Sequence, residues 1–294
     1  MRLVIALGGN ALLDPEQPQT IANQQEQINT VAPALAPILE EHDVILTHGN
    51  GPQVGNLMRQ QEQAPPKRPL DVLVAETQAQ IGYMLTQALE RQDVTAPTTL
   101  TRVVVDPASD AFDTPTKPVG PFLSAAQIED RPGTYRELGD GATPYRRVVP
   151  SPAPQRIREL PQIRDQLGQR DSTIACGGGG IPITPAGDGV EAVIDKDASS
   201  ALLAREIEAD KLILLTDVPY IYRDYGTDRQ EPIEHVDVTA NPFDSIDLGE
   251  GSMKPKAEAA KRFTEETGNE AIIGSLDNLE NVIEGKGTVF EADH

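Results

Sequence analysis

Short runs of mostly apolar residues recur along this chain, and each run ends in a glycine-rich or polar turn. An uninterrupted run of this length is typical of a strand that is buried on both faces of a parallel sheet. The segments between the runs are long enough to form helices. We therefore predict strands at residues 3–7, 44–46, 101–105, 174–176, 212–215, 271–273 and 288–290.

Apolar residues recur with helical spacing in the segments that connect these strands. The clearest case is residues 70–91, where every third or fourth position is apolar and one face is continuous. A second helix is predicted after Pro18, although Pro33 and Pro37 predict a kink or a late start. Strands that alternate with helices predict an α/β fold, a three-layer αβα sandwich around a mainly parallel central sheet.

Residues 107–154 depart from this alternation. The segment has nine prolines, four glycines and only short apolar runs. A structureless loop of this length would be unusual in a compact domain unless it served a function. We therefore predict a small subdomain that protrudes from the main sheet.

Several of the predicted strands end in turns that are rich in glycine. Ligands of parallel sheets bind at the carboxyl ends of the strands, and glycine lets backbone N–H groups approach an anion closely. The Walker, dinucleotide-binding and protein-kinase motifs are all absent, so a phosphate would be bound by a composite site. The turns that could form it are Gly8-Gly9-Asn10, Gly49-Asn50-Gly51 and the four glycines at 177–180.

Two of the eight lysines lie where a helix is expected to begin. Lys196 follows Asp195 and precedes Asp197, and Lys256 follows Pro255, which suits the first position of a helix. Unpaired N–H groups and the helix dipole make this end positive, so a lysine is normally disfavoured there. A bound phosphate would explain both lysines, and the alternative is that they are solvated surface residues.

The composition restricts the partners of the protein. There are 25 Lys and Arg against 46 Asp and Glu, and a formal net charge of -21 argues against nucleic acid and anionic membranes. The excess fits adaptation to high salt or an ordinary acidic enzyme. The single cysteine, Cys176, is placed in a buried strand and excludes an intramolecular disulfide. No run has the length of a membrane helix and Met1 leads directly into a strand, so we expect a cytoplasmic protein.

Nine stretches along the chain match the motifs of one protein family in the same order, and so many ordered matches are highly specific. They are ALGGNALL, THGNGPQVGNL, IGYML, PTKPVGPF, RRVVPSP, CGGGGIPI, VIDKDASSALLA, LTDVPYIY and GSMKPKAEAA. With them the sequence resembles carbamate kinases, of the amino-acid kinase superfamily, along nearly its whole length. GPQVGN, KPVGPF and RRVVPSP favour carbamate kinases over relatives that act on glutamate, aspartate, acetylglutamate or uridylate. Lys254, where a glycine is expected, and Glu76, in a helix that is usually less charged there, depart from the pattern.

The resemblance implies reversible phosphoryl transfer between ATP and carbamate, which gives ADP and carbamoyl phosphate, and a role in producing ATP in arginine fermentation. It also implies a homodimer and two lobes. Residues 1–200, with the subdomain over the site, would bind the carbamoyl phosphate side, and residues 201–294 would bind the nucleotide. Mg²⁺ should arrive with ATP or ADP, bound largely by phosphate and water, so we assign it no protein ligand.

The resemblance also implies roles for individual residues. Phosphoryl transfer depends mainly on alignment and charge neutralisation, so these are the roles expected of them. Lys117 on the subdomain, Lys196 and Lys256 would neutralise the phosphoryl group and the nucleotide phosphates. Asp197 would orient the lysines, and it is also a candidate helix N-cap. His48 would support its loop. The carbamoyl and phosphoryl oxygens would meet Gly8, Gly9, Asn10, Gly49, Asn50 and Gly51, and the nucleotide would meet Gly177, Gly178, Asp217, Tyr220 and Tyr222, with ordinary packing as the alternative for the tyrosines.

Two other classes of function stay open on the sequence. A different amino-acid kinase would share the nucleotide lobe but reject carbamoyl phosphate. A non-catalytic nucleotide-sensing module would also use glycine-rich strand ends, but it has no need of three lysines around one phosphoryl group.

Overall fold

In the computed structural model, which describes residues 1–13, 17–63, 66–168, 172–240 and 253–292, seven strands form a central sheet. Their order is β13-β15-β14-β10-β1-β2-β8, and all neighbours are parallel except β14 and β15. The predicted mainly parallel sheet is thus confirmed. The strands are β1 (Arg2–Leu7), β2 (Asp43–His48), β8 (Thr173–Ile174), β10 (Lys211–Thr216), β13 (His235–Asp237), β14 (Glu270–Ser275) and β15 (Thr288–Glu291).

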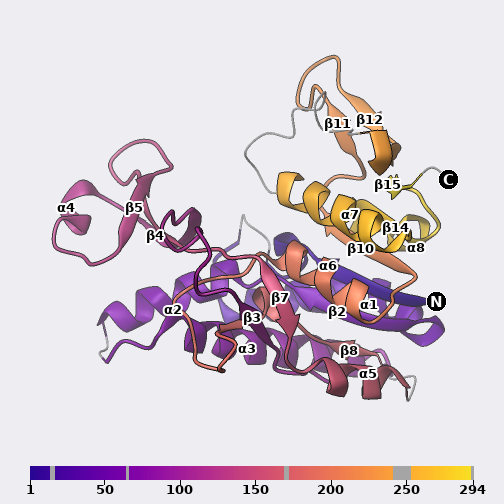
Figure 1. Cartoon of the computed structure of the whole chain (residues 1–294), viewed down its shortest axis with the longest axis horizontal. Coiled ribbons are helices and arrows are strands. Elements are labelled where there is room, and N and C mark those ends of the chain that lie inside the picture. The colour runs from indigo at the N-terminus through magenta and orange to yellow at the C-terminus, as the bar shows by residue number, and fades with distance from the viewer. Residues whose placement is uncertain (14–16, 64–65, 169–171, 241–252, 293–294) are drawn as a thin grey trace.

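Helices cover both faces of this sheet, as Figure 1 shows. Alternate residues of a strand point to opposite faces: Leu3 and Ile5 of β1 pack on one side, and Val4 and Ala6 pack on the other. Two cores result, and the three-layer αβα fold is confirmed. The core on the side of Leu3 and Ile5 is completed by α1 (Ile21–Glu41), α3 (Leu70–Glu90) and α8 (Leu279–Ile283). The core on the side of Val4 and Ala6 is completed by α5 (Leu160–Gly168), α6 (Lys196–Glu206) and α7 (Met253–Thr267).

Helix α1 runs through both of its prolines, so the predicted late start is wrong. The hydroxyl of Thr20 caps the helix by accepting a hydrogen bond from the N–H of Asn23 at 3.1 Å. Pro33 and Pro37 are one turn apart and both are exposed. The carbonyls that lose a helical partner to them can therefore be hydrated, and the buried face stays unbroken.

The strand predicted at residues 101–105 is present, but it belongs to a second sheet. Strand β3 (Arg102–Val105) pairs antiparallel with β7 (Pro154–Ile157) and parallel with β9 (Ile181–Ile183). Val103 and Val105 are fully buried in the core that contains α6. An apolar run shows that a strand is buried, but it does not show which sheet contains it.

Residues 107–154 contain the predicted subdomain, which projects from one end of the molecule beside α2 (Gly51–Gln63) (Figure 1). Val119 and Val149 pack on Val54 and Met58 of α2 in a small core of their own. Its elements are β4 (Lys117–Leu123), α4 (Ala125–Ile128), β5 (Thr134–Glu137) and β6 (Tyr145–Val149), with the strands antiparallel in the order β4-β6-β5.

The remaining regular elements are short. Strands β11 (Ile221–Arg223) and β12 (Glu231–Ile233) form an antiparallel pair. Single 3-10 turns occupy η1 (Gly9–Ala11), η2 (Gly177–Gly179), η3 (Val238–Ala240) and η5 (Leu276–Asn278). Within the described ranges, every helix is too short or too polar to cross a membrane.

Candidate active site

A cavity of about 350 Å³ lies at the carboxyl ends of β1 and β2. The turns after these strands, the glycine turn after β8, the starts of α6 and α7, and strand β4 of the subdomain all contribute to its wall. Segments that are far apart in the sequence therefore meet at one point. The predicted residues that line the cavity are Gly9, Gly49, Asn50, Gly51, Lys117, Gly178, Lys196 and Asp197, and Asp195 and Pro255 join them.

Two lysines share the buried carboxylate of Asp197. The Nζ of Lys196 lies 2.7 Å from Oδ1, and the Nζ of Lys256 donates a hydrogen bond to Oδ2 at 3.0 Å. Burial by itself would raise the pKa of Asp197, but the two ammonium groups outweigh it and lower the pKa to about 2. Asp197 thus stays ionised and holds both cations, of which Lys196 lines the cavity and Lys256 does not.

The ammonium of Lys196 is buried without an acceptor in hydrogen-bonding geometry, even though Asp197 Oδ1 is close. Burial lowers its pKa, the charge of Asp197 opposes this shift, and the nearby charge of Lys256 adds to it. A buried donor without an acceptor costs free energy. Because Lys196 also lines the cavity, an anion bound there would satisfy this ammonium.

Asp195 connects helix α6 to the subdomain, a role that the sequence did not reveal. Its Oδ1 accepts hydrogen bonds from the backbone N–H groups of Asp197 at 2.9 Å and Ala198 at 3.1 Å, so Asp195 is the N-cap and Asp197 is not. Its Oδ2 accepts a hydrogen bond from Lys117 Nζ at 2.7 Å. One carboxylate therefore orients the helix that carries Lys196 and holds Lys117 against it.

The glycine turn after β8 is shaped by close contacts. A Cβ at Gly178 would lie 2.1 Å from Asn50 Nδ2, and one at Gly179 would lie 2.2 Å from the carbonyl oxygen of Ile194. Both residues have positive φ, 64° and 86°. Only glycine fits these positions, and the tight packing fixes the turn against Asn50, whose amide also donates to Thr77 Oγ1 at 3.0 Å.

Cys176 is buried, as predicted, but the prediction that it lies in a strand is wrong. Strand β8 ends at Ile174, and Cys176 has the left-handed φ of 51° that starts the glycine turn. The thiol is surrounded by core residues, and burial raises its pKa to about 12. It therefore stays protonated and its place is structural.

The side chains of His48 and Gln78 pack against the glycine turn. His48 is fully buried, which lowers its pKa to about 4, so the neutral ring donates from Nδ1 to the Gly49 carbonyl at 2.9 Å. Gln78 donates to the carbonyls of Gly177 at 2.8 Å and Thr101 at 3.1 Å. Gly177 itself packs on His48 and Gln78 and does not line the cavity. A polar residue on the buried face of α3 was the only sequence signal for Gln78.

A second cavity of about 210 Å³ lies beside the carboxyl end of β1. Gly8 lines it together with the exposed residue Asp217. Tyr220 and Tyr222 line neither cavity, and their rings pack in a T-shaped, edge-to-face arrangement with centroids 6.3 Å apart. Asn10 lies in η1. Gly8, which was predicted for the phosphoryl group, therefore lies with Asp217, and the structure brings Tyr220 and Tyr222 to neither cavity.

Helix α7 begins at Met253, two residues before the predicted start at Pro255. Lys256 still falls in its first turn and is buried. Lys254 is exposed and helical, so its position does not require glycine. Gly251 and Ser252 of the predicted motif lie outside the described residues. The other departure, Glu76, forms a surface ion pair with Arg68 at 2.7 Å.

Residues 1–275 match the model of the Amino acid kinase family. The chain belongs to this family. A carbamate kinase of Halobacterium salinarum is 42% identical over 303 residues, which cover 99% of this chain and 98% of the relative. A carbamate kinase of Haemophilus influenzae is 42% identical over 301 residues, which cover 97% and 95%.

Solved structures agree with the fold. The carbamate kinase of Giardia lamblia bound to AMP-PNP superposes with a TM-score of 0.91 at 34% identity and covers 99% of this chain and 98% of that one. An isopentenyl phosphate kinase of T. acidophilum, at 15% identity and a TM-score of 0.58, shares the fold alone. The chain is therefore highly similar to carbamate kinases over nearly its full length.

Proposed function

We propose that this chain is a carbamate kinase, a phosphotransferase that moves a phosphoryl group reversibly between ATP and carbamate. The observation that carries the proposal is the buried ammonium of Lys196, which is ion-paired with Asp197 outside hydrogen-bonding geometry and lies at a cavity that Lys117 also lines. Carbamate kinases that are 42% identical over nearly the whole chain support the choice of substrate.

The residues of the cavity suit transfer of a phosphoryl group between two oxygens. In the forward direction an oxygen of carbamate bonds to the terminal phosphorus of ATP as the bond from phosphorus to the ADP oxygen breaks. Negative charge is spread over the three other phosphoryl oxygens. Lys196, Lys256 and Lys117 would neutralise this charge, while the amides of Gly9 and Gly49 would orient the oxygens.

Lys117 would change partners as the ligand binds. In the structure its ammonium donates a hydrogen bond to Asp195. A phosphoryl group in the cavity competes for the same ammonium, and Lys117 is the one cation of the three that the subdomain carries. We infer that the move from Asp195 to the ligand closes the subdomain over the site.

ATP or ADP would extend from this cavity toward the one that Asp217 lines. In the described residues there is no group of three or more His, Cys, Asp or Glu that could hold a metal ion. Mg²⁺ would arrive with the nucleotide, held by phosphate and water, and would neutralise phosphate charge. The lobes at residues 1–200 and 201–294 stay part of this proposal, as do the homodimer, the cytoplasmic location and ATP production in arginine fermentation.

The function is tested by mixing the purified chain with Mg²⁺, ADP and carbamoyl phosphate and measuring the ATP formed. We expect turnover with this donor and none with the phosphorylated products of glutamate, aspartate or acetylglutamate. Turnover with one of these alone would identify another amino acid kinase. Binding of ADP without any turnover would identify a nucleotide-sensing module.

Replacement of Lys117 with Ala is expected to lower kcat by roughly 10²-fold, because one charge-assisted contact to the phosphoryl group is lost. The affinity for ADP should change by less than about threefold, since Lys117 is assigned to the transferred group. Lys286→Ala, an exposed lysine that contacts Asn281, is the control. An unchanged kcat in Lys117→Ala would exclude the assigned contact.

The net charge of -21 leads us to propose that the protein is adapted to high salt. Self-repulsion of this size is screened within a few ångströms in molar salt but acts over longer distances in dilute buffer. We expect circular dichroism and ATP formation to be retained in molar potassium chloride and to decline in dilute buffer. Equal activity and equal secondary structure in both conditions would refute the proposal.

A further inference from the structure

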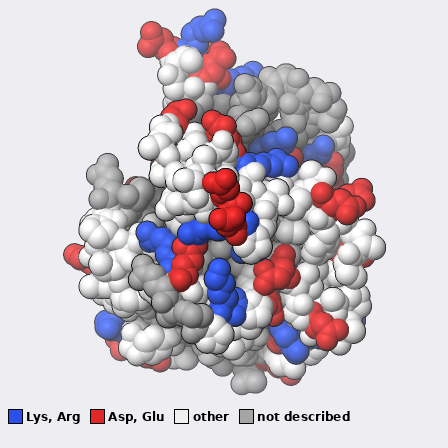
Figure 2. All heavy atoms as spheres, turned by 90° about the vertical axis from the view of Figure 1, so that its left-hand side faces the viewer, with Lys and Arg blue, Asp and Glu red and all other residues white. Residues whose placement is uncertain are grey.

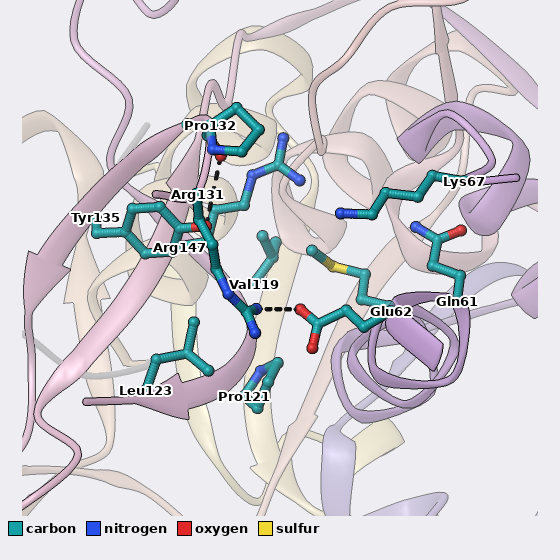
Figure 3. A pocket seen from close by; sticks show the side chains of 12 residues that line it. Gln61, Glu62, Lys67, Val119, Pro121, Leu123, Arg131, Pro132, Tyr135 and Arg147 are labelled. Atoms are coloured by element: carbon teal, nitrogen blue, oxygen red, sulfur yellow. Dashed lines mark hydrogen bonds and ion pairs between the residues drawn. The ribbon is translucent and has the colours of Figure 1, made fainter. Parts of the chain in front are cut away.

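A cleft outside the candidate active site lies between α2 and the protruding subdomain. It consists of two adjoining cavities of about 210 Å³ and 330 Å³ that share Met58, Gln61, Lys67 and Arg147. Figure 3 shows the first of them, with α2 on one side and strands of the subdomain on the other. None of the residues proposed for phosphoryl transfer lines it.

The residues that line this cleft have an excess of positive charge, whereas the whole chain has an excess of negative charge. Carboxylates outnumber cationic side chains 46 to 25 overall, whereas cations outnumber carboxylates among the residues of the cleft. Figure 2 looks at this end of the molecule and shows Lys and Arg side chains in the middle of the face, with Asp and Glu side chains among them. The charged residues that line the cleft are Lys67, Arg68, Arg131, Arg147, Glu62 and Glu191.

Most of these charges already have partners. Arg131 is paired with Glu62, and Arg68 is paired with Glu76 outside the cleft at 2.7 Å. Glu191 uses Oε1 to accept the backbone N–H of Leu70 at 2.8 Å, and its Oε2 is 3.5 Å from an Nη of Arg147. The carboxylates of the cleft are therefore occupied by other groups.

Lys67 and Arg147 keep donors that these pairs do not use. Lys67 forms no ion pair or hydrogen bond with any described residue. The Nε of Arg147 is buried without an acceptor. Figure 3 shows the ammonium of Lys67 and the guanidinium of Arg147 pointing toward one another across the cavity. Two cations that face each other repel unless an anion lies between them.

We propose that this cleft is a binding site for a small tetrahedral oxyanion with two negative charges, of the phosphate or sulfate class. Such an ion would accept from the guanidinium of Arg147 and from the Lys67 ammonium at once. Arginine donates to oxyanions through a planar fork of N–H groups, and hydrogen bonds between charged groups are the stronger kind.

The bound ion would act on the candidate active site through the subdomain. Val119 lines both this cleft and the active-site cavity, and Lys117 lies two residues earlier on strand β4. An ion between Lys67 and Arg147 would connect the loop after α2 to β6, which pairs with β4. It would thereby hold the subdomain, and Lys117 with it, against the body of the enzyme. This last step rests on the proposed carbamate kinase function, whereas binding of the ion does not.

The test locates the ion and measures its affinity without an activity assay. Crystals of the full chain soaked in selenate, a sulfate analogue with an anomalous signal, are expected to show a selenium peak between Lys67 and Arg147. Separate calorimetric titrations with sulfate and inorganic phosphate should then measure the affinity of this site. They use the Lys196→Met variant, in which anion binding at the active-site cavity is weakened. Binding of both ions identifies a general oxyanion site, and binding of phosphate alone identifies a phosphate site.

In that background Lys67→Gln is expected to weaken binding roughly tenfold or more, because a hydrogen bond to a charged group is lost. Lys67 is on an exposed loop, so the fold should survive. Lys286→Gln is the matched control and should leave the affinity unchanged. Equal affinity in Lys67→Gln and its parent, or a selenium peak only in the active-site cavity, would overturn the proposal. Neither result depends on whether the enzyme turns over carbamoyl phosphate.

Discussion

ATP formation from ADP and carbamoyl phosphate is expected to fall by roughly 10²–10³-fold when Lys196 is replaced with Met. Lys196 has a buried ammonium that is ion-paired with Asp197 outside hydrogen-bonding geometry, and it lies at the cavity where the phosphoryl oxygens would gather negative charge. Removal of a single donor that is fixed in place toward a developing charge costs about 10²–10³ in kcat. Met retains most of the volume of the lysine stem, so the core around α6 should stay packed.

The measurement is kcat and KM for both substrates, with circular dichroism to confirm the fold. Lys211→Met is the control, because Lys211 is also a partly buried lysine, paired with Glu270 at 2.8 Å at the opposite end of its strand from Thr216. We expect near-normal turnover in the control. Near-normal turnover in Lys196→Met would contradict the role assigned to Lys196 and, with it, the geometry of the proposed transfer.

The sequence was most informative where a local pattern decides the structure. Runs such as residues 3–7 and 212–215 must be buried on both faces, so their strands and the helices between them could be predicted. The resemblance named the lysines, and the structure brings Lys117, Lys196 and Asp197 to one cavity. Their chemical roles stay predictions until the variants are measured.

The sequence was least informative where distant segments decide the structure. Whether residues 101–105 join the central sheet depends on β7 and β9, which pair with β3 from far along the chain. The prolines of α1 were misjudged because their exposure is a tertiary property. The dual contact of Asp195 needs the subdomain in place, since Lys117 is 78 residues away.

Replacement of Asp197 with Asn is expected to lower the free energy of unfolding by about 3–5 kcal/mol and to remove turnover, because it leaves two buried ammonium groups without their shared counter-ion. Denaturant unfolding and the ATP assay measure the two effects. The double variant Asp197→Asn, Lys256→Met should regain part of the stability but none of the turnover, since one unpaired cation is removed. A stable and active Asp197→Asn enzyme would show that the carboxylate does not hold these lysines.

The same carboxylate predicts how stability depends on pH. The pKa of Asp197 is about 2 in the folded protein and 3.8 is its ordinary value, because Lys196 and Lys256 outweigh the opposing effect of burial. A depressed carboxyl pKa stabilises the fold fully above the ordinary value and loses this contribution as pH falls through the folded value. Between about pH 4 and pH 2 the wild-type protein should therefore lose stability more steeply than Asp197→Asn, which has no proton to take up. Parallel acid-unfolding curves for the two proteins would show that the charge of Asp197 contributes nothing to the fold.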